Sequence, residues 1–202
     1  MIAADAALER LREGNARFTT ELGRGGVGRV RGGPLPTVQE PFAIVLGCSD
    51  SRVPAEIVFD QGLGDLFVIR VAGNVVAPSQ VGSVEFAAER YHTRLVVVLG
   101  HSTCGAILAA LEELDRPSQQ RSPNLRSIVD RVRPSVEGLL HTELRHDRTA
   151  LIHEAVRANV RASVDHLRHG SEILERLIQT DGLKVVGAEY SLETGHVDFF
   201  DP

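Results

Sequence analysis

Five residues of types that bind metal ions or carry charge lie just after two apolar stretches of the sequence. They are Cys48, Asp50, Arg52, His101 and Cys104. Cysteine sulfur, histidine nitrogen and aspartate oxygen are ligands that Zn²⁺ takes in a tetrahedral site. The short spacing of His101 and Cys104 lets one turn supply two ligands, and Cys48 supplies a third. These residues predict a zinc site whose fourth position holds either Asp50 or a water molecule.

Arg52 bears on the role of Asp50, because a carboxylate and a guanidinium two residues apart can form a bidentate pair. A paired Asp50 is held off the metal and stays ionised, whereas an unpaired Asp50 can move to the metal and displace its water. Small buried core residues or a disulfide are alternative interpretations of the cysteines. Cys104 as a nucleophile with His101 as its base is less favoured, because neighbouring side chains at one turn suit shared ligation.

The apolar stretches predict the strands that position these residues. Each stretch is continuous, rich in β-branched residues and bounded by turn residues, as in parallel strands covered on both faces. Helical patterns between them predict an α/β fold, with a mainly parallel central β-sheet flanked by helices. In such sheets, ligands bind beyond the carboxyl ends of the strands. The expected strands are 42–47, 66–71, 94–100, 184–190 and 196–200, and the expected helices are 4–19, 78–91, 104–114, 124–140 and 148–178.

The 202 residues are most simply one domain, in which residues 1–36 form an N-terminal helix and connector and residues 37–202 form the α/β core. The connector contains a Gly-x-Gly-x-x-Gly pattern at 23–28. It lacks the preceding strand and following helix of a dinucleotide-binding loop, so we interpret it as a linker. A surface loop is expected at 115–124, and Asn15 is expected to have a capping or loop role.

Composition and charge disfavour several classes of protein. The net charge of −5 argues against a general nucleic-acid-binding protein, which usually has a basic face. No apolar run approaches the roughly 20 residues of a membrane helix, and the N-terminus lacks the pattern of a signal peptide. We therefore expect a cytoplasmic protein without nucleic-acid or membrane partners, whose two cysteines are reduced.

Two motifs, "CSDSR" (48–52) and "GHSTCGA" (100–106), closely resemble the metal-binding motifs of the β-class carbonic anhydrases. The resemblance covers nearly the whole chain, from "LREGNARF" near the N-terminus to "VVGAEYSLETG" (185–195). It implies a zinc enzyme that hydrates CO₂ reversibly to bicarbonate and a proton, through attack of a zinc-bound hydroxide. It also implies a homodimer or homotetramer, with active sites at a dimer interface and the N-terminal helix packed on the partner subunit.

The resemblance implies a role for each of the five metal-binding or charged residues that follow the two apolar stretches. Cys48, His101 and Cys104 correspond to the zinc ligands of the family. Asp50 and Arg52 correspond to a catalytic dyad that controls the fourth zinc position.

A substrate pocket is implied in the same way. Gln39 matches a glutamine that plant-type members contribute from the neighbouring subunit to bind a substrate oxygen. Gly105 matches a glycine whose backbone N–H can bond to bicarbonate. Phe67, Ala72 and Phe86 match positions that line the apolar CO₂ pocket, and the family commonly has valine and tyrosine at the last two.

A second subtype of the family is regulated by bicarbonate, which binds in a pocket of tryptophan, arginine and tyrosine. Arg70 and Tyr190 fall at the arginine and tyrosine positions, but Val45 replaces the tryptophan. Because Gln39 is present and the tryptophan is absent, the resemblance favours the constitutively accessible, plant-type (type I) subtype.

Two alternatives to CO₂ hydration stay open. One is a hydrolase on the same scaffold that acts on CS₂ or COS, whose zinc site would look the same. The other is a non-catalytic, zinc-stabilised binding module in which Asp50 is a permanent fourth ligand. The presence of Arg52 argues against the module, because a permanently ligated Asp50 would not need that partner.

Overall fold

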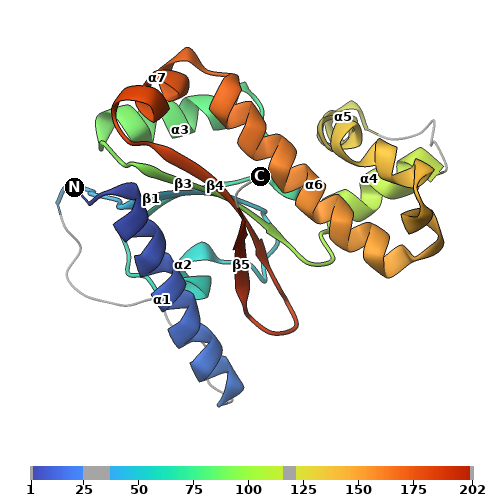
Figure 1. The fold of residues 1–202 in the computed structure, drawn as a ribbon, viewed down its shortest axis with the longest axis horizontal. Helices are drawn as coiled ribbons and strands as arrows, with labels where there is room; N and C mark the ends of the chain where they lie inside the picture. The colour runs from blue at the N-terminus through green and yellow to red at the C-terminus, as the bar shows by residue number, and fades with distance from the viewer. Residues whose placement is uncertain (1, 25–36, 116–121, 201–202) are drawn as a thin grey trace.

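The computed structural model describes residues 2–24, 37–115 and 122–200, and Figure 1 shows how its elements are arranged. The strands are β1 (Ala43–Gly47), β2 (Leu66–Arg70), β3 (Leu95–His101), β4 (Lys184–Tyr190) and β5 (Val197–Phe200). They form one five-stranded sheet in the order β2-β1-β3-β4-β5. Only the β4–β5 pair is antiparallel, which confirms the mainly parallel sheet expected from the apolar stretches.

Helices cover both faces of this sheet (Figure 1). The α-helices are α1 (Ala4–Gly23), α2 (Ala55–Val58), α3 (Pro78–Arg90), α4 (Gly105–Asp115), α5 (Pro123–Val136), α6 (Arg148–His169) and α7 (Glu172–Thr180). Short 3₁₀ helices span Ala72–Asn74, Glu137–His141 and Glu143–His146. α1 and α2 lie on one face and α3, α6 and α7 on the other, while α4 and α5 pack beside α6 at one end.

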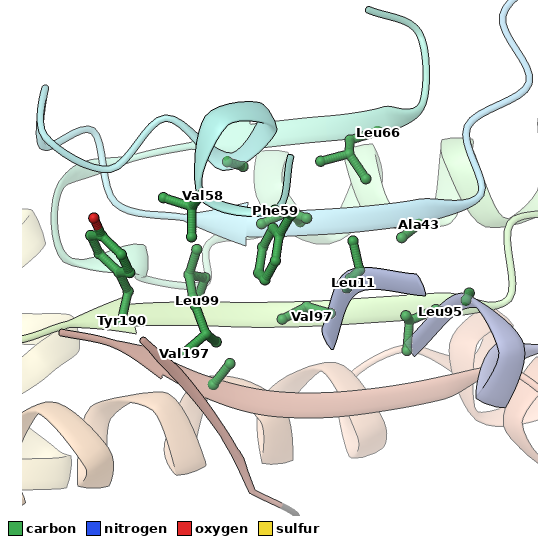
Figure 2. Close-up of a cluster of buried hydrophobic side chains, with 14 of the residues drawn as sticks. Leu11, Ala43, Val58, Phe59, Leu66, Leu95, Val97, Leu99, Tyr190 and Val197 are labelled. Carbon is green, nitrogen blue, oxygen red and sulfur yellow. The ribbon is translucent and has the colours of Figure 1, made fainter. Parts of the chain in front are cut away.

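Successive side chains of each strand enter two different hydrophobic cores. Val97 and Leu99 of β3 pack with Leu11 of α1 on one face, as Figure 2 shows. Val96 and Val98 of the same strand pack in the core beneath α3, α6 and α7. Because both faces are covered, the strands are apolar throughout instead of alternating with polar residues.

The single helix expected over 148–178 is wrong, because the structure has two helices there. Gly170 is the C-cap of α6. The Ser171 hydroxyl accepts a hydrogen bond from the Leu174 N–H and caps α7, a role that serine commonly fills. The helical spacing of apolar residues continues across this break and conceals it in the sequence.

Parts of two predicted segments lie outside the described residues. They are residues 25–36, with most of the Gly-x-Gly-x-x-Gly pattern, and residues 116–121 of the expected surface loop. The helix expected over 124–140 is seen as α5 followed by a 3₁₀ helix. None of the helices in the described ranges combines the length and apolarity required to span a lipid bilayer.

Asn15 lies in the middle of α1, so the capping or loop role expected for it is wrong. Its Nδ2 donates hydrogen bonds to the carbonyl oxygens of Val58 (3.0 Å) and Gly195 (2.9 Å). Its Oδ1 accepts a hydrogen bond of 2.9 Å from the Val197 N–H. The side chain is buried and thereby fastens α1 both to α2 and to the β4–β5 connection.

Replacing Asn15 with alanine is expected to lower the free energy of unfolding by about 3 kcal/mol, because buried backbone groups lose their partners. Urea unfolding followed by circular dichroism measures the change. Thr20→Ala is the matched control, since the exposed Thr20 hydroxyl donates a hydrogen bond within its own helix, to the carbonyl of Ala16. Equal losses in the two variants would contradict this role for Asn15.

Candidate metal centre

Cys48, His101 and Cys104 form a buried cluster where β1 and β3 end. Their ligand atoms lie within 4.8 Å of one another. The two strands pair in parallel, so their carboxyl ends meet at one edge of the sheet. The Sγ atoms of the cysteines are 3.9 Å apart, whereas a disulfide requires about 2.05 Å. The cysteines are therefore free thiols, and the structure brings together the three residues that the sequence singled out.

The His101 ring is oriented with one nitrogen available to a metal. Nδ1 lies 3.0 Å from the carbonyl oxygen of Ser102, which suits donation of its N–H. Nε2 is fully buried and finds no hydrogen-bond partner among the described residues. Leaving a buried polar atom without a partner is costly. A metal ion held between this nitrogen and the two thiols would satisfy it, as a backbone-oriented histidine ligand commonly does.

Two backbone features that the sequence analysis missed shape the cluster. Thr103 has a φ of +53°, a left-handed conformation that is rare for a β-branched residue, in the turn between His101 and Cys104. Gly73 has a φ of +70°, and its N–H donates to the Cys48 Sγ over 3.4 Å. The only signal for Gly73 in the sequence is a glycine just after a predicted strand.

The thiols are polarised by their mutual contact. Hydrogen bonding with Cys104 is the main influence on Cys48, and it outweighs burial to lower the pKa of Cys48 to about 4. The same contact, followed by burial, raises the pKa of Cys104. A cation bound between them would stabilise both thiolates and release the second proton. Two thiolates and one imidazole make a donor set that suits Zn²⁺, so the residues present fit this metal.

Asp50 and Arg52 form a bidentate ion pair beside the cluster. Arg52 Nε donates to Asp50 Oδ1 over 2.9 Å, and Nη2 donates to Oδ2 over 2.7 Å. The backbone N–H of Arg52 also donates to Oδ1 over 3.0 Å. Hydrogen bonding by the Arg52 side chain holds the pKa of Asp50 well below its usual range. Asp50 Oδ2 lies 3.8 Å from His101 Nε2, so the ionised carboxylate is next to the cluster while both of its oxygens bond to Arg52.

Arg70 supports the loop that carries these residues. Its Nε donates to the carbonyl oxygen of Cys48 over 3.0 Å, and its Nη2 donates to that of Asp50 over 2.5 Å. Arg70 ends β2, next to β1, which places its guanidinium against the loop. The sequence alone gave no sign of this contact.

Two of the predicted pocket residues lie beside the cluster. Ala72 directly precedes Gly73, whose N–H contacts Cys48. Gly105 directly follows Cys104 as the first residue of α4. Apart from its two chain neighbours and the nearby backbone of α4, no described atom lies within 4 Å of the position that a β-carbon on Gly105 would occupy, so the space beside this glycine is open.

The other predicted pocket residues, Gln39, Phe67 and Phe86, lie elsewhere. The Phe67 and Phe86 rings are 6.4 Å apart between centroids, and the Gln39 amide bonds to Tyr91 next to them. Phe67 pairs with Ile44, four residues before Cys48, which corresponds to about 13 Å along the strand. Gln39, Phe67 and Phe86 therefore lie away from the cysteine–histidine cluster of their own chain.

Comparison with known proteins agrees with these observations. Residues 43–197 match the family model described as "Carbonic anhydrase". The chain is 39% identical over 194 residues to the carbonic anhydrase of Mycolicibacterium smegmatis, a match that covers 96% of this chain and 91% of that protein. It is 40% identical over 192 residues to carbonic anhydrase 2 of Mycobacterium tuberculosis, covering 94% of this chain and 89% of that protein.

Solved structures show the same fold. The β-carbonic anhydrase CafA of Aspergillus fumigatus matches with a TM-score of 0.74 and 27% identity, over 98% of this chain and 90% of that chain. The β-carbonic anhydrase CcaA matches with a TM-score of 0.71 and 26% identity, over 96% and 88% of the two chains. Because sequence and fold agree over almost the full length, the chain belongs to the carbonic anhydrase family, as an enzyme of the β class.

Proposed function

We propose that this enzyme hydrates CO₂ reversibly to bicarbonate and a proton at a zinc ion held by Cys48, His101 and Cys104. The observation that carries the proposal is the buried cluster in which His101 Nε2, without a partner among the described residues, faces two free thiols. Zinc bound there would supply a Lewis acid that brings the pKa of a coordinated water from about 15.7 towards 7.

Asp50 and Arg52 govern the open fourth position in this proposal. Arg52 occupies both carboxylate oxygens of Asp50, which keeps Asp50 ionised and prevents it from becoming a fourth ligand. From its place 3.8 Å from His101 Nε2, the carboxylate can accept a hydrogen bond from the reacting water and orient it towards CO₂.

A homo-oligomer, either a homodimer or a homotetramer, completes the site. Gln39, Phe67 and Phe86 are remote from the cluster of their own chain, and β2, which carries Phe67, is an edge strand of the sheet. Phe86 is 52% exposed, so a neighbouring copy can cover it. In this arrangement Phe67 and Phe86 line the CO₂ pocket of the neighbour, and the Gln39 amide bonds to a substrate oxygen. Ala72 and Gly105 complete the pocket from the chain that holds the zinc.

The contacts of Arg70 and Tyr190 support the constitutively accessible, plant-type subtype. Arg70 is engaged by the carbonyl oxygens of Cys48 and Asp50. Tyr190 is buried in the core beneath α1, together with Val45. These structural roles account for the arginine and the tyrosine without a regulatory bicarbonate site.

Stopped-flow CO₂ hydration by the zinc-loaded protein, measured from about pH 6.5 to 9, tests the proposed function. We expect fast turnover that rises with pH and is highest on the alkaline side. The reason is that two thiolates donate more charge to zinc than imidazoles do, which raises the pKa of a zinc-bound water. Zinc-loaded protein without turnover at any pH would contradict CO₂ hydration and turn attention to CS₂, COS or a non-catalytic zinc site.

A further inference from the structure

A hydrogen bond from a distant part of the chain, rather than regular secondary structure, holds the Gln39 side chain in the described residues. Residues 37–42 form neither helix nor strand, and Gln39 is exposed. Its Nε2 donates a hydrogen bond of 2.7 Å to the hydroxyl of Tyr91, 52 positions away in the sequence. The amide orientation therefore depends on where this hydroxyl lies.

The Tyr91 hydroxyl is itself fixed by the packing of its ring. Tyr91 is the C-cap of α3, and its backbone N–H bonds to the carbonyl of Ala87. Its ring lies 6.1 Å from the Phe67 ring and 5.6 Å from the Phe86 ring, to which it is nearly perpendicular at 82°. Such edge-to-face contacts favour particular ring orientations, so the hydroxyl is a rigid point beside a flexible side chain.

The chemistry of the two groups makes this contact an orienting one. A glutamine amide has a donor end and an acceptor end, and a tyrosine hydroxyl both donates and accepts. Whichever end Tyr91 holds, the other end is directed away from Tyr91 and is available to a ligand. A glutamine side chain without this hydrogen bond would lose much conformational freedom when it binds a ligand. A side chain whose amide is already held loses less.

We propose that Tyr91 is a positioning residue that orients the Gln39 amide for substrate. The inference rests on the function proposed above, in which Gln39 serves the zinc site of a neighbouring subunit. Tyr91 contacts Gln39 and the two phenylalanines, and it acts on the reaction through Gln39.

A double-mutant cycle tests this role in the zinc-loaded oligomer, with Tyr91→Phe, Gln39→Ala and the double variant compared with the unmodified protein. Tyr91→Phe keeps the ring and removes only the hydroxyl. We expect it to lower kcat/KM for CO₂ by about 3- to 10-fold, the effect of one hydrogen bond, through KM more than kcat. In the Gln39→Ala background the same change is expected to have no further effect. Zinc content, oligomer size and the thermal unfolding midpoint are expected to stay within error.

Three outcomes would overturn the inference, and they differ in what they say of the proposed function. A full loss from Tyr91→Phe in the Gln39→Ala background would show that Tyr91 acts independently of Gln39. A loss in Gln39→Ala with none in Tyr91→Phe would leave the role of Gln39 intact and remove that of Tyr91. Unchanged kinetics in Gln39→Ala would remove both roles, whereas an unmodified protein without turnover would overturn the proposed function itself.

Discussion

Replacing His101 or Cys104 with alanine is expected to abolish stoichiometric zinc binding and to lower kcat/KM for CO₂ by at least about 1,000-fold. A metal Lewis acid contributes several kcal/mol to such a reaction, and about 4 kcal/mol corresponds to this factor. Each variant keeps only two of the three proposed ligands, all of which are buried. In Cys104→Ala, the Cys48 thiol also loses the contact that contributes most to lowering its pKa, so its thiolate becomes less available.

Zinc per subunit, measured by atomic absorption after dialysis against a chelator, and stopped-flow kinetics check this prediction. His166→Ala is the matched control, because His166 is an exposed histidine of α6 outside the cluster. It is expected to keep full zinc content and activity. A His101→Ala or Cys104→Ala variant that retains one zinc per subunit and full turnover would contradict the assigned ligand set.

Replacing Arg52 with alanine is expected to lower kcat/KM by about 100-fold, because the charge-assisted, bidentate hydrogen bonds that hold Asp50 are lost. The pKa of Asp50, which Arg52 holds well below its usual range, then rises towards its ordinary value. The freed carboxylate still ionises at neutral pH and can move to the fourth metal position. Arg52→Lys is expected to restore only part of the activity, since lysine cannot reproduce the bidentate geometry.

The visible spectrum of the cobalt-substituted protein reports this closure directly. Arg52→Ala is expected to change the spectrum, as a fourth protein ligand would, and Arg52→Ala combined with Asp50→Asn is expected to reverse the change. Arg176→Ala is the control, because Arg176 is about as exposed as Arg52 and makes an ion pair of 2.8 Å with Glu89, away from the cluster. Full activity and an unchanged cobalt spectrum in Arg52→Ala would rule out the role given to this pair.

The direction of the Asp50 shift also constrains the pH dependence. A carboxyl group with a lowered pKa contributes stability above its ordinary pKa of about 3.9, and this contribution is lost as the pH falls through the lowered value. Asp50 therefore stays ionised throughout about pH 6.5 to 9 in the intact pair. A rise of activity in that window is expected to belong to another group, consistent with a water at the metal.

Much of the sheet and of the metal cluster could be predicted from the sequence. β4 begins and ends at the predicted residues, 184 and 190, and the first three strands differ from the predictions by only a residue or so at their ends. The reason is that a strand covered on both faces must be apolar along its whole length. The polar residues that follow β1 and β3 then share one edge of the sheet, so ligands far apart in sequence were expected together.

Local patterns could not predict features that depend on distant partners. The break between α6 and α7 is concealed because the apolar spacing continues through Gly170 and Ser171. Asn15 resembles a capping residue by type, yet its amide bonds to Gly195, 180 positions away. A residue type indicates which bonds a side chain can make, but the folded chain alone supplies the partner.

The predicted pocket residues also show that local patterns cannot place distant segments relative to one another. Motif positions assigned Gln39, Phe67 and Phe86 to a substrate pocket. In the structure they gather around Tyr91, near the start of β1, whereas Cys48 follows the end of this strand. Residue types and strand ends were enough to predict that Cys48, His101 and Cys104 lie together, because three metal-binding side chains at one sheet edge allow few arrangements. The contacts of Gln39 with Tyr91 and of Arg70 with the Cys48 carbonyl came only from the folded chain, since each depends on how separate segments pack.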